Sequence, residues 1–185
     1  KAHDLKHFIA DLRGGKYADD SGLAEIQEAV EKYEQTANTG NKALDSVLTE
    51  KMYACHKNGI AFSMLVQGSE LSFMSLADIT SVFGNILSNA IECEQGVEDR
   101  EKRYIFLKVF RTGGLICIHA ENYSTAQPQF KDSLPMTTKG SGDYHGFGLK
   151  SVRYVAKKYG GNLTLSATGE KFVVDIIIPV PRAKK

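Results

Sequence analysis

The chain lacks several features that would narrow its function at once. Its 185 residues carry 23 Lys and Arg against 22 Asp and Glu, so the formal net charge is only +1. A balance this even provides no bulk attraction for nucleic acid or for a strongly charged partner. There is no apolar run near 18 residues and no signal peptide. The sequence therefore predicts neither a membrane-spanning helix nor a secretory leader.

Cysteine is also scarce. Three cysteines lie too far apart in the sequence for a metal knuckle or a redox pair: Cys55, Cys93 and Cys117. Scattered cysteines beside apolar residues are typical of reduced, partly buried thiols in a cytosolic setting. Internal repeats and low-complexity tracts are absent too. The ordinary composition and the length predict one medium domain, or a small domain with a short helical segment.

The first part of the chain has helical periodicity. Apolar residues recur at helical spacing in residues 2–13, and a second helix is expected to run to about residue 57. That helix is expected to break or kink at residues 36–41, which contain a glycine and two asparagines. We expect residues 1–58 to form a helical hairpin. Half-bundles of this kind often dimerise, because one hairpin buries too little apolar surface.

The pattern changes after residue 59. Strands are predicted at 60–66, 104–110, 115–120, 163–167 and 172–178, and helices at 76–93 and 147–158. Residues 59–185 should therefore form an α/β sandwich, with helices on one face of a mixed, mostly antiparallel sheet, which makes the chain an α+β protein. Residues 123–145 have no periodicity, and a loop of this length is usually a lid or disordered.

The segment His3-Asp4-Leu5-Lys6-His7 lies on the first predicted helix. On a helical wheel, both histidines fall opposite the apolar stripe, where an exposed imidazole could attack a phosphoryl group. Asp4 could accept the proton from the other ring nitrogen, and Lys6 could steady developing negative charge. A merely solvated polar face is the simpler alternative. A metal site from His3 and His7 is a third reading, although no third ligand is evident.

Asn85 and Asn89 are one turn apart on the helix predicted at 76–93, so their amides share a face. Neutral amide oxygens suit Mg²⁺, which keeps waters and also takes phosphate oxygens. Asparagine is a mediocre helix former, so two of them on one mid-helix face indicate a use. Hydrogen bonding to a neighbouring loop is the alternative. Glu92 near the same end could polarise a water or ligand, or simply be exposed.

The segment Gly146-Phe147-Gly148-Leu149 ends the long loop and opens a helix. Glycines let backbone amides approach phosphate oxygens, and the helix N-terminus adds a favourable dipole. A tight turn is the simpler reading. The segment is not a Walker loop, because no Gly-Lys-Ser/Thr follows a strand. Lys139 could close over the phosphates from the preceding loop.

In order and spacing, these segments resemble the cytoplasmic kinase core of bacterial sensor histidine kinases, in the branch similar to accessory-gene-regulator quorum-sensing kinases. Residues 85–92 resemble the N box, 134–139 the lid and 145–152 the second glycine box. The N box and second glycine box at this spacing are fairly specific to the Bergerat-type (GHKL) ATP fold. Residues 3–7 resemble the phosphoacceptor box, which separates a kinase from other members.

The resemblance implies a dimerisation and phosphoacceptor hairpin in residues 1–58 and an ATP-binding catalytic domain in 59–185. His3 would accept the γ-phosphoryl group of ATP, with Asp4 as general base, and would pass it to an aspartate of a response regulator. Asn89 would bind Mg²⁺. Further contacts with ATP are implied for Asn85, Asn122, Lys139, Gly146, Gly148 and Leu149.

Homodimerisation through the N-terminal helices is also implied, with no nucleic-acid partner. The chain begins at Lys1 without Met, with its first helix already under way. We therefore expect it to be the cytoplasmic part of a longer membrane sensor, with membrane contact only through upstream segments.

Two departures from the family pattern are visible. The usual first glycine box, Asp-X-Gly-X-Gly, is replaced by Glu121-Asn122-Tyr123-Ser124. Asn122 could accept a hydrogen bond from the adenine amino group in place of the missing aspartate, with Glu121 as the alternative; the quorum-sensing branch favours Asn122. His7 stands where many kinases carry Asn or Thr, which puts phosphatase activity in doubt. A different GHKL ATPase, or a pseudokinase that only binds, remain the competing functions.

Overall fold

The computed structural model describes residues 36–126, 128–131, 134–135 and 147–181. The chain divides into two units, residues 1–37 and 38–185, and nearly all described residues belong to the second. The predictions for His3 and Asp4, and for the hairpin's first helix, lie outside the described residues. No helix within the described ranges is long and apolar enough to cross a membrane.

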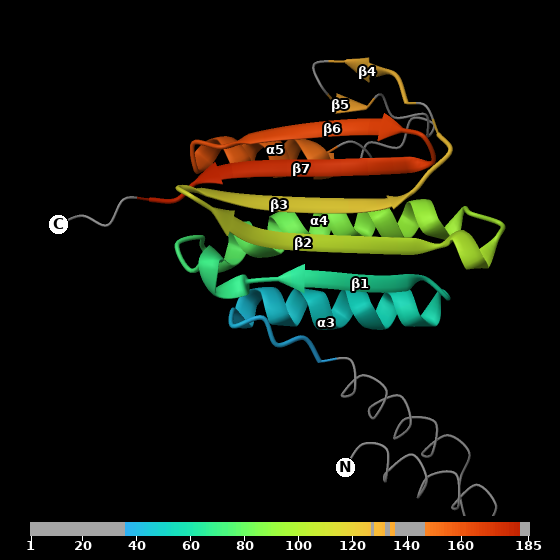
Figure 1. The fold of residues 1–185 in the computed structure, drawn as a ribbon, viewed down its shortest axis with the longest axis horizontal. Helices are drawn as coiled ribbons and strands as arrows, with labels where there is room; N and C mark the ends of the chain where they lie inside the picture. Colours follow the sequence, from blue (N-terminus) through green and yellow to red (C-terminus); the bar gives the residue numbers. More distant parts are fainter. Residues whose placement is uncertain (1–35, 127, 132–133, 136–146, 182–185) are drawn as a thin grey trace, which may run out of the picture. The chain divides into compact units, whose positions relative to one another are not determined.

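A five-stranded sheet forms the centre of the second unit, in the order β1-β2-β3-β7-β6 (Figure 1). The strands are β1 (Ala61–Val66), β2 (Tyr104–Thr112), β3 (Leu115–Tyr123), β6 (Asn162–Thr168) and β7 (Lys171–Pro179). The β1–β2 pair is parallel and the other three pairs are antiparallel. The predicted mixed, mostly antiparallel sheet is therefore confirmed.

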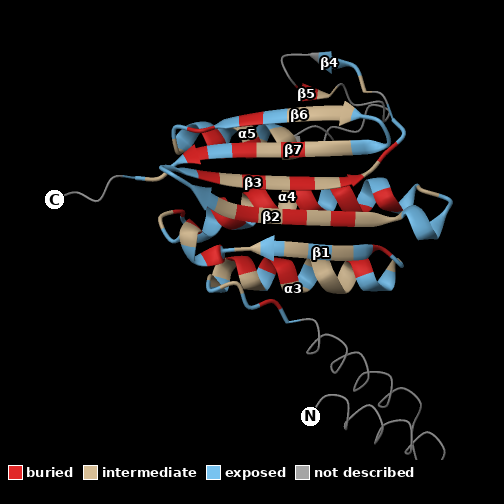
Figure 2. Cartoon of the chain, viewed as in Figure 1, coloured by how far each residue is buried: buried red, intermediate tan, exposed pale blue. Residues whose placement is uncertain are grey.

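Helices cover one face of this sheet, and no helix of the described residues covers the other, which we call the open face (Figure 1). The helices are α3 (Lys42–Lys57), α4 (Leu76–Gln95) and α5 (Phe147–Lys158). In β3, the even-numbered residues 116–122 are buried and the odd-numbered residues are not, which gives the alternating colours of Figure 2. The buried face is the one that packs on α4, so the core lies between the sheet and the helices.

Short elements complete the unit. Two 3₁₀ helices span Gly68–Leu71 and Arg100–Lys102, and a two-stranded hairpin pairs β4 (Phe130–Lys131) with β5 (Leu134–Pro135). This hairpin lies inside the segment predicted to be one long loop. Strands of two residues are too short to produce a period in the sequence.

Helix α3 starts directly after the break predicted at residues 36–41. Asn41 caps it, since its side chain accepts hydrogen bonds from the amides of Ala43 and Leu44. The preceding backbone is tied to the same unit, because the Gly68 amide donates to the Thr39 carbonyl at 3.0 Å. Helix α3 therefore packs with the sheet unit, and the break between units at 37/38 differs from the boundary predicted at 58/59.

A polar clamp joins the start of α4 to the end of α5. Ser75 caps α4, since its side chain accepts a hydrogen bond from the Asp78 amide. The buried Asp78 carboxylate accepts from Ser75 Oγ at 2.5 Å, from Lys158 Nζ at 2.7 Å and from the Tyr159 hydroxyl at 2.6 Å. These hydrogen bonds, with that from Lys158 the strongest influence, lower the pKa of Asp78 to about 2.

Candidate functional site

Helix α4 and the start of α5 meet at Asn85 and Gly148. The Asn85 amide nitrogen donates to the Ser81 carbonyl at 2.6 Å, which anchors the side chain on its own helix. A Cβ added to Gly148 would lie 3.0 Å from Asn85 Oδ1. The two predicted motifs are thus in direct proximity, and the missing side chain at Gly148 is what allows it. Leu149 follows in the first turn of α5 and is half-buried.

Asn89 lies one turn further along α4 and is exposed. In the part of the chain that is described, its side chain makes no hydrogen bond, so its amide oxygen is available to a ligand. No group of three or more His, Cys, Asp or Glu side chains within the same ranges could hold a metal ion. A single neutral amide oxygen fits Mg²⁺ only where waters and phosphate oxygens supply the remaining ligands.

The face of α4 that carries both asparagines continues to Cys93, at the same four-residue spacing. Cys93 Sγ lies 3.8 Å from the Tyr123 carbonyl at the end of β3. Asn85 and Cys93 are eight residues apart, or about 12 Å along the helix axis. One polar face of α4 therefore runs from the N-terminus of α5 to the end of β3.

Asn122 lies at the β3 end of this face and is only 4% exposed. Its amide nitrogen donates to the Tyr123 carbonyl at 2.9 Å and to Glu94 Oε1 at 3.3 Å. Among the described residues, nothing donates to Asn122 Oδ1. The amide is thus held by its donor end, and its acceptor end is left for another group.

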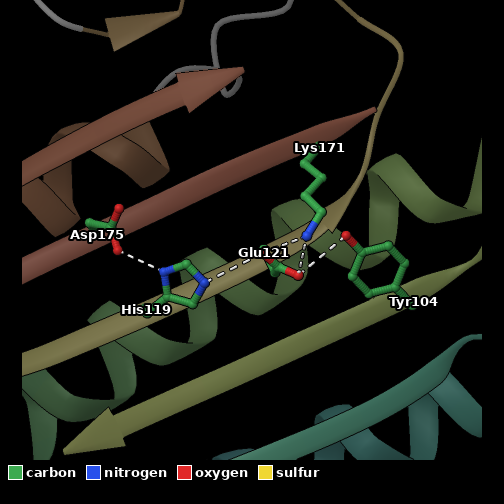
Figure 3. Close-up of polar contacts among 5 residues, drawn as sticks. All are labelled: Tyr104, His119, Glu121, Lys171 and Asp175. Carbon is green, nitrogen blue, oxygen red and sulfur yellow. Dashed lines mark hydrogen bonds and ion pairs between the residues drawn. The ribbon is translucent and has the colours of Figure 1, made fainter. Parts of the chain in front are cut away.

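Glu121, the alternative to Asn122, lies on the opposite face of the sheet. Figure 3 shows its carboxylate in a polar cluster on the open face. Lys171 Nζ approaches its two oxygens at 3.0 and 3.2 Å, and the Tyr104 hydroxyl donates at 3.4 Å. Burial raises the pKa of Glu121, but the Lys171 ammonium and the neighbouring His119 lower it on balance. Glu121 therefore faces away from the asparagines of α4.

The polar cluster extends across β3 and β7. His119 Nδ1 lies 2.7 Å from Asp175 Oδ1, and its Nε2 lies 3.6 Å from Glu121 Oε2 (Figure 3). His119 and Asp175 are direct cross-strand partners in the β3–β7 register. These charged groups pair with one another on the open face, away from the polar face of α4.

Glu94 is a site residue that was not predicted from the sequence. It is fully buried, at 0% exposure, and its Oε2 accepts from the Tyr104 amide at 3.1 Å while Oε1 accepts from Asn122. Its signal is in the sequence: Glu94 follows Ala90 by one turn on the apolar stripe of α4, where a carboxylate needs buried partners. The remaining predicted site residues, Lys139 and Gly146, lie outside the described residues. Glu92 is exposed on α4.

Comparisons with solved structures agree with this architecture. The catalytic domain of the histidine kinase ThkA, in a nucleotide-free form, aligns with a TM-score of 0.58 at 18% identity, covering 75% of this chain and 92% of that chain. The histidine kinase AdeS from Acinetobacter baumannii gives 0.52 at 12% identity, covering 98% and 96%. The kinase domain of a blue-light-activated histidine kinase from Erythrobacter litoralis gives 0.51 at 16% identity, covering 97% and 85%.

These identities are low, so the structural likeness establishes the fold alone. No curated protein sequence matches the chain. A family model described as the GHKL domain matches residues 74–179, which include α4, α5 and β2 to β7. The match covers more than half of the sequence, and the chain belongs to the GHKL domain family.

Proposed function

We propose that the chain binds ATP along the polar face of α4 and uses it to phosphorylate its own histidine. The proposal rests on the proximity of Asn85 to Gly148. The side-chain amide of Asn85 lies beside the first turn of α5, where Gly148 has no side chain. Family membership implies ATP binding. The proximity supports a phosphate position at the start of α5, where backbone amides and the helix dipole favour an anion.

The other end of the polar face suits the base. Asn122 Oδ1 would accept a hydrogen bond from the adenine amino group, in place of the aspartate of the usual first glycine box. Glu121 is unsuited to this role because it lies on the open face with Lys171. Asn89 would hold Mg²⁺ between these two ends, and the ion would supply positive charge to the phosphates.

The kinase step rests on the N-terminal histidine box. A nitrogen of His3 would attack the γ-phosphorus of ATP, forming a P–N bond while the bond from phosphorus to the bridging oxygen breaks and ADP leaves. Asp4 would take the proton from the other ring nitrogen. The phosphoryl group would then pass to an aspartate of a response regulator. We further propose that residues 1–37 contribute to a homodimer, and that the chain is the cytoplasmic part of a membrane-anchored quorum sensor.

The test is incubation of the whole chain with γ-labelled ATP and Mg²⁺. Wild type should become labelled with an acid-labile phosphoryl group, and His3→Gln should not. Asn89→Ala should lose labelling because Mg²⁺ is no longer held, whereas Asn162→Ala on the edge strand β6 serves as a matched control and should label normally.

Other outcomes would identify the competing functions. Label that persists on His3→Gln would refute the choice of acceptor. Release of phosphate without phosphoprotein would indicate a GHKL ATPase of another kind. ATP binding with neither labelling nor turnover would indicate a binding module.

A further inference from the structure

Glu94 and Asn122 form a buried pair between α4 and β3. Both side chains are more than nine-tenths buried, and Glu94 Oε1 lies 3.3 Å from Asn122 Nδ2. The other carboxylate oxygen accepts from the Tyr104 amide, where β2 begins. The pair is held from three elements, so neither side chain is free to swing away without leaving a buried polar group unpaired.

The chemistry of the pair fixes which end of the Asn122 amide faces Glu94. An asparagine amide has one donor end and one acceptor end. Two acceptors, Glu94 Oε1 and the Tyr123 carbonyl, converge on one position at 3.3 and 2.9 Å. A flipped amide would place Oδ1 against both oxygens and would lose both hydrogen bonds, so the donor end must occupy that position.

The ionisation of Glu94 is consistent with this role. Burial raises the pKa of Glu94, and hydrogen bonds from Asn122 and from the Tyr104 and Tyr123 backbone, with the charge of Arg103, partly offset the rise. Both carboxylate oxygens act as acceptors, at 3.3 and 3.1 Å. A neutral group at the same place, such as a glutamine amide, could instead donate to Asn122.

We propose that Glu94 is a positioning residue that makes Asn122 an acceptor toward the nucleotide base, so that the site selects a purine with an amino group over one with a carbonyl group at the same position. This inference rests on the proposed function, because it takes Asn122 to contact the base. Adenine offers the matching donor. Guanine would place its carbonyl oxygen against Oδ1 and leave both acceptors unpaired, which is the kind of mismatch that binding sites reject strongly.

The test compares ATP and GTP binding by calorimetry in the presence of Mg²⁺, using the whole chain. Wild type should prefer ATP. Glu94→Gln should reduce the ATP-to-GTP preference by up to about tenfold, the equivalent of one hydrogen bond. The new amide can donate to Oδ1 of a flipped Asn122, and this hydrogen bond offsets the one that the flip loses at the Tyr123 carbonyl. Glu98→Gln, an exposed glutamate three residues beyond α4, is the matched control and should keep the wild-type preference.

A charge exchange provides the second variant pair. Asn122→Asp alone places a second carboxylate about 3 Å from Glu94, and it should bind ATP at least tenfold more weakly at neutral pH. Adding Glu94→Gln should recover most of the affinity, because the glutamine amide can donate to the new carboxylate. A purely structural role for Glu94 would make the double variant the weakest of the series.

The outcomes separate this inference from the function on which it rests. An unchanged ATP-to-GTP preference in folded Glu94→Gln would overturn the positioning role while leaving ATP binding intact. A double variant no better than Asn122→Asp would also overturn it, even if Glu94→Gln alone fails to fold. Wild type that binds neither nucleotide would overturn the proposed function, and this inference with it.

Discussion

Replacing Gly148 with alanine separates nucleotide binding from stability. Gly148 lies in the first turn of α5, and an added Cβ would meet Asn85 Oδ1 at 3.0 Å, Cγ at 3.5 Å and Cβ at 3.6 Å. The Asn85 side chain would have to shift by a few tenths of an ångström against its 2.6 Å hydrogen bond to Ser81. Such a displacement costs about 0.5–1.5 kcal/mol, while alanine in a helix gains up to about 1 kcal/mol over glycine.

The two effects nearly cancel in the folded protein but not in the complex. The free energy of unfolding of Gly148→Ala should stay within about 1 kcal/mol of wild type, by the same figures. At the phosphate position that we propose, the new methyl group would keep phosphate oxygens from approaching the backbone amides closely. Loss of one charge-assisted hydrogen bond there costs about 1.5–3 kcal/mol, which weakens ATP binding by roughly 10- to 100-fold.

The assay is a pair of measurements on each variant, urea unfolding and calorimetric ATP titration. Gly84→Ala on α4, where an added Cβ meets nothing within 4 Å, is the control for the helix-propensity gain. It should be stabilised by up to about 1 kcal/mol. Wild-type ATP affinity in Gly148→Ala would refute the phosphate position. A large loss of stability in Gly148→Ala would show that the Asn85 side chain cannot shift to accommodate the added methyl group.

Three further predictions concern the framework. Gly161→Ala should lower the free energy of unfolding by about 2–4 kcal/mol in urea titrations, since its Cβ would lie 2.3 Å from a β7 carbonyl; wild-type stability would contradict this. The pKa of Asp78 falls from 3.8 to about 2 on folding, so its stabilisation is present above pH 4 and lost as pH drops toward 2. Acid unfolding of Asp78→Asn should be less steep over that range, and an identical profile would exclude the Lys158 clamp. Burial, and to a lesser extent the charge of Glu94, raises the pKa of the Cys55 thiol to about 12. Native protein should therefore be alkylated at Cys93 and not at Cys55. Equal alkylation rates at the two residues would show that the Cys55 thiol is accessible and would contradict this prediction.

Local signals in the sequence were sufficient for most elements of the second unit. Helix α4 was predictable because its cap, Ser75 and Asp78, is contained in four residues. The strands of the β2–β3 and β6–β7 hairpins were predictable because alternation and glycine turns are local too, with Gly113 and Gly169 both at positive φ. The four strands of these two hairpins are longer than predicted, since the hydrogen bonds of the sheet continue past the last apolar residue.

Tertiary partners were not predictable in the same way. The apolar stripe of α3 is compatible with a helical hairpin or with a sheet, and periodicity alone does not say which surface covers it. In the structure that partner is α4 and β1. The buried role of Glu94 also depends on Asn122, which is 28 positions away in the sequence. The shared face of Asn85 and Asn89 could be predicted from the sequence, because residues four positions apart on a helix lie on the same side.

The opposite faces of β3 have a consequence for how such a site can change. Asn122 and Glu121 are neighbours in the sequence. Because successive residues of a strand face opposite sides of the sheet, the neutral amide of Asn122 is buried and the carboxylate of Glu121 lies on the open face. Insertion of one residue in the β2–β3 turn would exchange their faces if β3 shifts by one position against its neighbours. A single inserted codon could thus bring a carboxylate, in place of the neutral amide, to the position where we propose that adenine is bound, without any substitution at residue 121 or 122.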